Sequence, residues 1–179
     1  YGDTAAAVER NLVRVPWPAA GEKKTVLFTK VNRANEALDA VGAELAKLPE
    51  NVRRYVAHPN GAFNWRTIQG TTRLSPHSYG IAIDFDMPNV PNQYWRWTAH
   101  GEGETGKGKA GKDEAGKGEA PSEPQASESN YPSAILNNAA LRQIVETFER
   151  HGFIWGGKWF HYDLMHFEYR PELVLAVAH

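Results

Sequence analysis

Hydrophobic residues recur every three or four positions in two stretches of the chain, residues 31–48 and 133–150. This spacing places the apolar side chains on one face of a helix. Pro49 follows the first stretch as a stop signal, and Gly152 follows the second at a position where helices commonly end. We therefore predict two amphipathic helices, each of which buries one face.

Shorter segments have the composition or alternation of β-strands, and a turn at residues 59–61 separates two of them. The predicted strands cover residues 26–28, 52–56, 62–68, 81–86, 153–155 and 166–169. Pro171 ends the last strand, and residues 173–177 then form a helical turn. The pattern predicts an α+β fold in which a small antiparallel sheet is flanked by helices.

The domain organisation follows from length and local composition. With 179 residues, of which 41% are hydrophobic, the chain has the size of a single domain, residues 1–179. Residues 1–24 mix charges with prolines and are expected to form an arm that lies on the domain. Residues 101–130 contain no aromatic or branched aliphatic side chain and cannot bury enough apolar area to offset the entropy of ordering. We predict a solvated insert there, and a flap over a substrate groove is the alternative.

Overall charge and composition exclude several classes of function. The formal net charge is -1, so the chain has no basic field that would recruit nucleic acid. The chain has no cysteine, which excludes disulfides and leaves nitrogen and oxygen donors for any metal. No apolar run approaches the ~20 residues that span a bilayer. The chain starts at Tyr1 rather than at methionine, from which we expect a mature or trimmed form, and we expect a monomer.

Half of a metal site is recognisable between residues 75 and 86. Alternation in this segment places Asp84 and Asp86 on the strand face opposite to the apolar side chains. Gly80 allows a sharp turn, so His77 can fold back over the face that carries Asp84. An imidazole and a carboxylate would then converge. A catalytic zinc site takes three protein ligands, so one more must come from elsewhere.

The candidate for the third ligand is His166, in a second segment that is rich in histidine and acidic residues. Alternation places His166 and Glu168 on the same face of a strand. Asp163 precedes His166 by three residues, which lets its carboxylate reach a metal-bound water without binding the metal. His161 lies two residues before Asp163, and it could contact substrate, orient a carboxylate or simply be a surface residue.

Two sequence motifs carry a resemblance to a known family. The run S-x-H-x-x-G-x-A-x-D at residues 75–84 and the run D-x-x-H-F-E at residues 163–168 resemble those of the zinc peptidoglycan peptidases. That family includes D-alanyl-D-alanine carboxypeptidases, vancomycin-resistance D,D-peptidases and L-alanyl-D-glutamate endolysins, and it shares its fold with the hedgehog signalling domain. The resemblance spans roughly residues 50–172 apart from the insert.

The resemblance implies a set of metal ligands and a catalytic carboxylate. His77, Asp84 and His166 correspond to the ligands of one Zn²⁺ ion, and Asp163 corresponds to the catalytic carboxylate. Some members of the family have glutamate at that position, with the same spacing to the histidine.

Four further residues are candidates for supporting roles, and the resemblance implies the role of the two arginines among them. Arg66 corresponds to the arginine that steadies the scissile carbonyl oxygen, and Arg73 competes for that role. Glu168 is expected to accept an imidazole N–H from a ligand, with a plain surface glutamate as the alternative. Ser75 either contacts substrate or hydrogen-bonds within its loop, and we favour the loop.

The implied activity is hydrolysis of peptide bonds in peptidoglycan stem peptides by a metal-activated water. The D-alanyl-D-alanine carboxypeptidase and the L-alanyl-D-glutamate endopeptidase types both fit. Such an enzyme works in the bacterial cell envelope, either periplasmic or secreted, and a phage endolysin ranks below it. The alternative is a non-catalytic, zinc-stabilised cell-wall binding module of the hedgehog-like fold.

Overall fold

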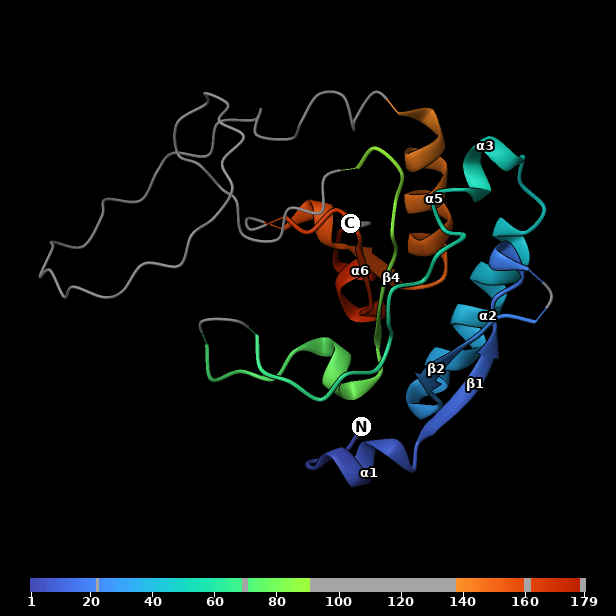
Figure 1. Ribbon diagram of the computed structural model, residues 1–179. Coiled ribbons are helices and arrows are strands. Elements are labelled where there is room, and N and C mark those ends of the chain that lie inside the picture. Colours follow the sequence, from blue (N-terminus) through green and yellow to red (C-terminus); the bar gives the residue numbers. More distant parts are fainter. Residues whose placement is uncertain (22, 69–70, 91–137, 160–161, 178–179) are drawn as a thin grey trace, which may run out of the picture.

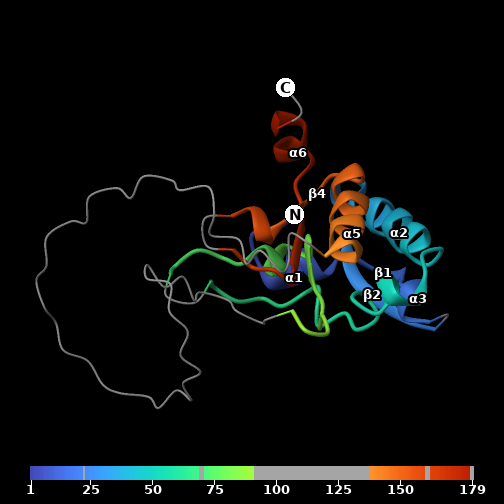
Figure 2. The same cartoon turned by 90° about the horizontal axis from the view of Figure 1, so that it is seen from above.

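The computed structural model describes residues 1–21, 23–68, 71–90, 138–159 and 162–177, and it has an α+β architecture (Figure 1). The predicted fold class is confirmed. Two small antiparallel sheets lie next to a pair of longer helices, α2 (Ala34–Leu45) and α5 (Ala139–Arg150), which pack against each other (Figure 2). No helix in the described ranges is long and apolar enough to cross a membrane.

A three-stranded sheet occupies the centre of the molecule, with β5 (His166–Tyr169) between β3 (Ala82–Asp84) and β4 (Phe153–Trp155). Both neighbours run antiparallel to β5. The predicted strands 153–155 and 166–169 are therefore confirmed, and the predicted strand 81–86 is shorter than expected. The register pairs Asp84 with His166, which brings residues 82 positions apart in the sequence directly opposite each other.

Both long helices lie inside the predicted ranges. A 3₁₀ turn at Val31–Arg33 precedes α2, and the chain leaves this turn through Asn32 and Arg33, which both have positive φ. Asn138 caps the start of α5, because its side chain accepts hydrogen bonds from the N–H groups of Ala140 (3.0 Å) and Leu141 (3.2 Å). Gly152 follows α5 with a φ of 84°, as its predicted role at a helix end requires.

The core between the helices and the central sheet is aromatic. Phe148 of α5 stacks on Phe167 of β5 with ring centroids 4.0 Å apart, and its ring also meets Phe153 edge-on. Trp17 and Phe85 extend this cluster, and all five side chains are fully buried. These contacts fix the sheet face opposite to the one that carries Asp84 and His166.

Two predicted strands are wrong. Residues 52 and 53 end a short helix, α3 (Glu50–Arg53), and residues 54–56 form the turn after it. Pro49 is the residue that precedes the first turn of this helix. Local hydrogen bonds, such as Arg54 N–H to the Glu50 carbonyl at 3.0 Å, satisfy this backbone. The segment 62–68 contains only one isolated bridge, between Thr67 and Leu74. Apolar runs this short do not distinguish a strand from a helical turn or a loop.

Residues 1–24 contain more secondary structure than the arm expected there. A short helix, α1 (Ala5–Glu9), is followed by β1 (Leu12–Pro16), which pairs antiparallel with β2 (Thr25–Thr29). The strand predicted at residues 26–28 is thus confirmed, but its partner was not foreseen. Trp17 follows β1, and its buried indole N–H donates to the Val56 carbonyl at 2.8 Å. This end of the segment is part of the core rather than an arm lying on it.

The aromatic core gives a direct stability test. Replacing Phe148 by alanine removes the ring that contacts both β4 and β5, and we expect a loss of about 3–5 kcal/mol in the free energy of unfolding. Glu146→Ala, on the exposed side of the same helix, should change it by less than about 0.5 kcal/mol. Urea denaturation measures both values, and equal effects of the two substitutions would contradict the described packing.

Candidate metal centre

Three segments bring His77, Asp84 and His166 to one point. The sheet register sets Asp84 opposite His166. His77 lies in a 3₁₀ helix (Pro76–Tyr79) that ends at Gly80, whose φ of 64° turns the chain back into β3. A side chain at Gly80 would also collide with Leu12 of β1, because an added Cβ would lie 2.5 Å from it. The tight turn thus holds His77 beside the strand that carries Asp84.

One atom from each of these three side chains faces a common centre. Nδ1 of His166 lies 2.8 Å from Oδ1 of Asp84, and Nε2 of His77 lies 3.2 Å from each of these two atoms. Neighbouring ligand atoms around a tetrahedral zinc ion are roughly 3.3 Å apart, given bonds of about 2.0–2.2 Å. Two imidazole nitrogens and a carboxylate oxygen are also ligands that zinc accepts. The three side chains therefore fit a divalent metal ion.

The ring nitrogens on the far side of the two histidines support the same interpretation. Nδ1 of His77 lies 3.1 Å from the Ala62 carbonyl, which can only accept, so this nitrogen carries the proton. Nε2 of His166 is buried without a hydrogen-bond partner in the described structure, and Oε2 of Glu168 lies 3.7 Å away. Metal-binding histidines usually direct their other N–H at a carbonyl or carboxylate. Both rings therefore have the orientation that ligands require.

Charge in the centre is balanced by hydrogen bonds. Burial works against ionisation of Asp84, but the hydrogen bond from His166 and the nearby His77 ring outweigh it and hold the pKa of Asp84 well below its usual range. Burial likewise disfavours the His166 cation, yet the hydrogen bond to Asp84 and the nearby Glu168 carboxylate raise the pKa of His166 to about 9. Without a metal, a proton is thus held where a cation would bind.

Asp163 lies beside the three converging side chains but does not belong to them. Its backbone is fixed on both sides, since its N–H donates to the Gly156 carbonyl at 2.9 Å and its carbonyl accepts from the His166 N–H at 3.3 Å. The residue is 7% exposed. Burial raises the pKa of Asp163, and the neighbouring His166 opposes part of that rise. A raised pKa is the property that a carboxylate needs to exchange protons nearer to neutral pH.

The remaining candidates lie around the His77 turn. Ser75 is buried and its Oγ accepts the His77 N–H at 3.4 Å, as expected for a loop role. The Arg66 backbone is bound to this turn: its N–H donates to Ser78 Oγ at 2.9 Å, and its carbonyl accepts from Ser78 Oγ and from Ser75 N–H. Arg73 lies at the end of the same loop. Both arginine side chains are exposed.

Glu168 is buried rather than a plain surface glutamate, with its side chain 5% exposed. Nη1 of Arg170 donates to Oε1 of Glu168 at 2.9 Å, and its positive charge compensates the negative charge of the buried carboxylate. Its other oxygen faces His166. His161 and the insert 101–130 lie outside the described residues.

Sequence reasoning missed three residues that shape the centre. The Ala62 carbonyl orients His77 through its backbone, which no side-chain pattern reveals. Trp159 packs on the His166 ring with centroids 5.1 Å apart. Gly156 lets the Asp163 segment approach, because an added Cβ would lie 2.5 Å from the Asp163 carbonyl oxygen. The paired glycines at 156 and 157 were the available signal, but they indicated only a turn.

Comparison with known proteins gives one match. A family model described as D-alanyl-D-alanine carboxypeptidase matches residues 69–169, which is more than half of the chain and includes the three converging residues and Asp163. Comparisons with curated proteins and with solved structures gave no match.

The proton on His166 predicts how metal binding depends on pH. Because the pKa of His166 is about 9, a metal ion that binds Nδ1 at pH 7.5 must displace a proton. We expect release of about one proton per zinc ion, and an apparent affinity that falls about tenfold for each pH unit below 8. Calorimetry in buffers of different ionisation enthalpy measures the release. Binding without proton release would contradict the raised pKa of His166.

Proposed function

Since the chain belongs to the D-alanyl-D-alanine carboxypeptidase family, and is thus a peptidase of the kind that acts on peptidoglycan, we propose that it is a zinc-dependent enzyme that hydrolyses peptide bonds in peptidoglycan stem peptides. The observation that carries this proposal is the convergence of His77, Asp84 and His166 beside the separate, buried carboxylate of Asp163. A terminal D-alanine and an L-alanyl-D-glutamate bond are the two candidate sites of cleavage. The cell envelope, where this polymer lies, is the proposed place of action.

Different residues of the chain would have separate roles in this reaction. His77, Asp84 and His166 would hold the ion, with Ala62 and Glu168 fixing the two imidazoles from behind. A zinc ion in such a site supplies Lewis-acid chemistry, since it polarises a peptide carbonyl and makes water acidic enough to attack at neutral pH.

Asp163 would move the proton. Its carboxylate accepts a proton from the attacking water and delivers it to the leaving amine. Burial favours this exchange, because it raises the pKa of Asp163 towards the pH at which the group both takes up and returns a proton. The two backbone hydrogen bonds to Gly156 and His166 hold the residue next to the centre without making it a ligand.

Arg66 is the residue that we propose stabilises the negative charge that develops on the carbonyl oxygen of the substrate. Its backbone is hydrogen-bonded to Ser75 and Ser78, which flank the proposed ligand His77 in the sequence. The position of the Arg66 backbone relative to His77 is therefore fixed. Loss of one such donor typically costs ~3 kcal/mol of transition-state stabilisation. Arg73 remains the alternative donor.

A pair of substitutions tests the division of roles. Asp163→Ala should lower hydrolysis by about 10²–10⁴-fold and leave zinc bound, because it removes the proton carrier alone. His166→Ala should lose both zinc and activity, because it removes a ligand. Zinc content is measured by metal analysis, and hydrolysis by mass spectrometry of muropeptides released from purified peptidoglycan.

Asp86→Ala is the matched control, since Asp86 is an exposed acid two residues beyond Asp84 and should change neither quantity. Equal loss of zinc in the Asp163 and His166 variants would show that the roles are misassigned. Zinc binding by the unmodified chain with no cleavage of peptidoglycan would favour a binding module instead of an enzyme.

A further inference from the structure

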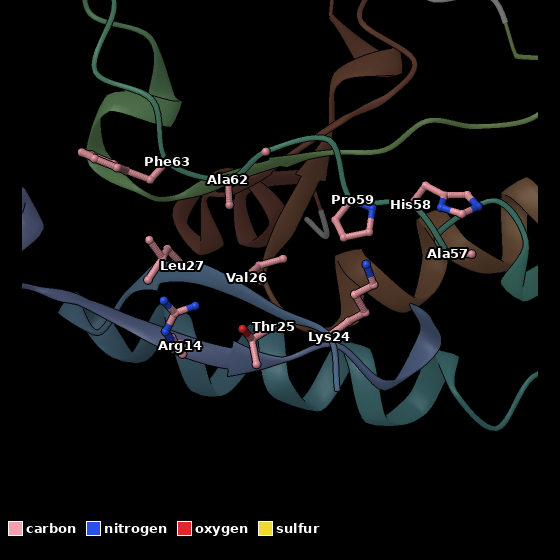
Figure 3. Close-up of a pocket in the computed structure, with 11 residues that line it drawn as sticks. Arg14, Lys24, Thr25, Val26, Leu27, Ala57, His58, Pro59, Ala62 and Phe63 are labelled. Atoms are coloured by element: carbon pink, nitrogen blue, oxygen red, sulfur yellow. The ribbon is translucent and has the colours of Figure 1, made fainter. Parts of the chain in front are cut away.

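A groove of about 460 Å³ lies between the β1–β2 hairpin and the segment that leads towards the metal centre (Figure 3). Neither the three converging side chains of the metal centre nor Asp163 is among the described residues that line it. One wall comes from the hairpin, residues 14 and 24–27, and the other from residues 57–59 and 61–63. The groove is therefore a separate surface feature, although Ala62 contributes both to its wall and to the orientation of His77.

The hairpin wall of this groove is an unpaired strand edge. The N–H of Thr29 leaves the hairpin and donates to the Gly80 carbonyl at 2.9 Å, while the N–H of the next residue, Lys30, points back towards the β1 side. In an antiparallel pair these directions alternate with a period of two residues. The N–H and C=O groups of Leu27 and Thr25 therefore also point away from β1, and the described structure gives them no partner.

The opposite wall presents backbone as well. Pro59 forms an isolated antiparallel bridge next to β3, in which the Asn60 N–H donates to Asp84 and the His58 carbonyl accepts from Asp86. The Pro59 carbonyl then points away from that pairing, on the side that faces the groove. Between the two walls lie donors and acceptors that an added strand could satisfy.

The side chains around the groove are basic and apolar. Arg14 and Lys24 are exposed and form no ion pair among the residues that the structure describes, and the Lys24 side chain extends across the gap towards Pro59 (Figure 3). The described residues that line the groove include no acidic residue. Leu27 is 40% exposed, unlike nearly all other large apolar side chains in the described ranges. The groove thus offers positive charge and one apolar contact along a free edge.

We propose that this groove binds an extended acidic peptide, which adds as a strand to the free edge of β2. Backbone hydrogen bonds to Thr25 and Leu27 supply the register, and Arg14 and Lys24 bind carboxylates of the peptide. A peptide fits better than a phosphate polymer, because only a peptide has the alternating N–H and C=O groups that match a strand edge. The site does not depend on the hydrolytic function, since no metal-centre side chain takes part.

Fluorescence anisotropy with a labelled, capped hexapeptide of alternating valine and glutamate tests the proposal on the full chain. The double variant Arg14→Glu/Lys24→Glu should weaken binding at least about tenfold, because it places like charges opposite each other. Arg10→Glu/Lys47→Glu changes the net charge equally at exposed positions away from the groove, and should alter the Kd less than about twofold.

The strand-edge part of the proposal has its own readouts. The same peptide N-methylated at alternate amides keeps its charge but cannot form the ladder, and its Kd should rise at least about tenfold. Binding of the unmodified peptide should slow hydrogen exchange at the Leu27 amide. Equal weakening in both double variants, an unchanged Kd for the methylated peptide, or tighter binding of inorganic polyphosphate than of the peptide would each overturn the assignment.

Discussion

The pairing of Asp84 with His166 across β3 and β5 is the constraint on which the centre depends. It brings a carboxylate and an imidazole to 2.8 Å from two segments that are remote in the sequence. Burial alone would oppose charge on either group, but each stabilises the ionised form of the other. The aromatic cluster of α5, β4 and β5 holds the sheet from the other face, so the register is set by packing as well as by backbone hydrogen bonds.

Under the proposed mechanism, the same register separates metal binding from proton transfer. His166 belongs to the strand, whereas Asp163 lies in the loop before it, tied to Gly156 and to the His166 backbone. Three residues of separation thus place one side chain among the converging atoms and leave the other beside them. Glu168, two residues further along the strand, faces the rear of the His166 ring and is itself held by Arg170. The eight residues 163–170 therefore supply a proposed ligand, the carboxylate beside it, and the pair of side chains behind the ligand.

Much of the site and part of the fold could be predicted from sequence. Alternation identified the strands that carry Asp84 and His166, and helical spacing identified α2 and α5, because these elements bury one face each. The prediction of a strand at residues 52–56 is wrong because local hydrogen bonds of α3 and the turn after it stabilise that short apolar run. The pairing of β1 with β2 and the hydrogen bond from His77 to Ala62 are tertiary backbone interactions, which side-chain patterns do not encode.

Anomalous diffraction at the zinc absorption edge, from crystals grown with the metal, tests the central claim most directly. The account predicts one ion within about 2.0–2.2 Å of Nε2 of His77, Nδ1 of His166 and a carboxylate oxygen of Asp84, with the Asp163 carboxylate outside bonding distance. An ion bound to Asp163, or two imidazoles that do not share a metal, would contradict it.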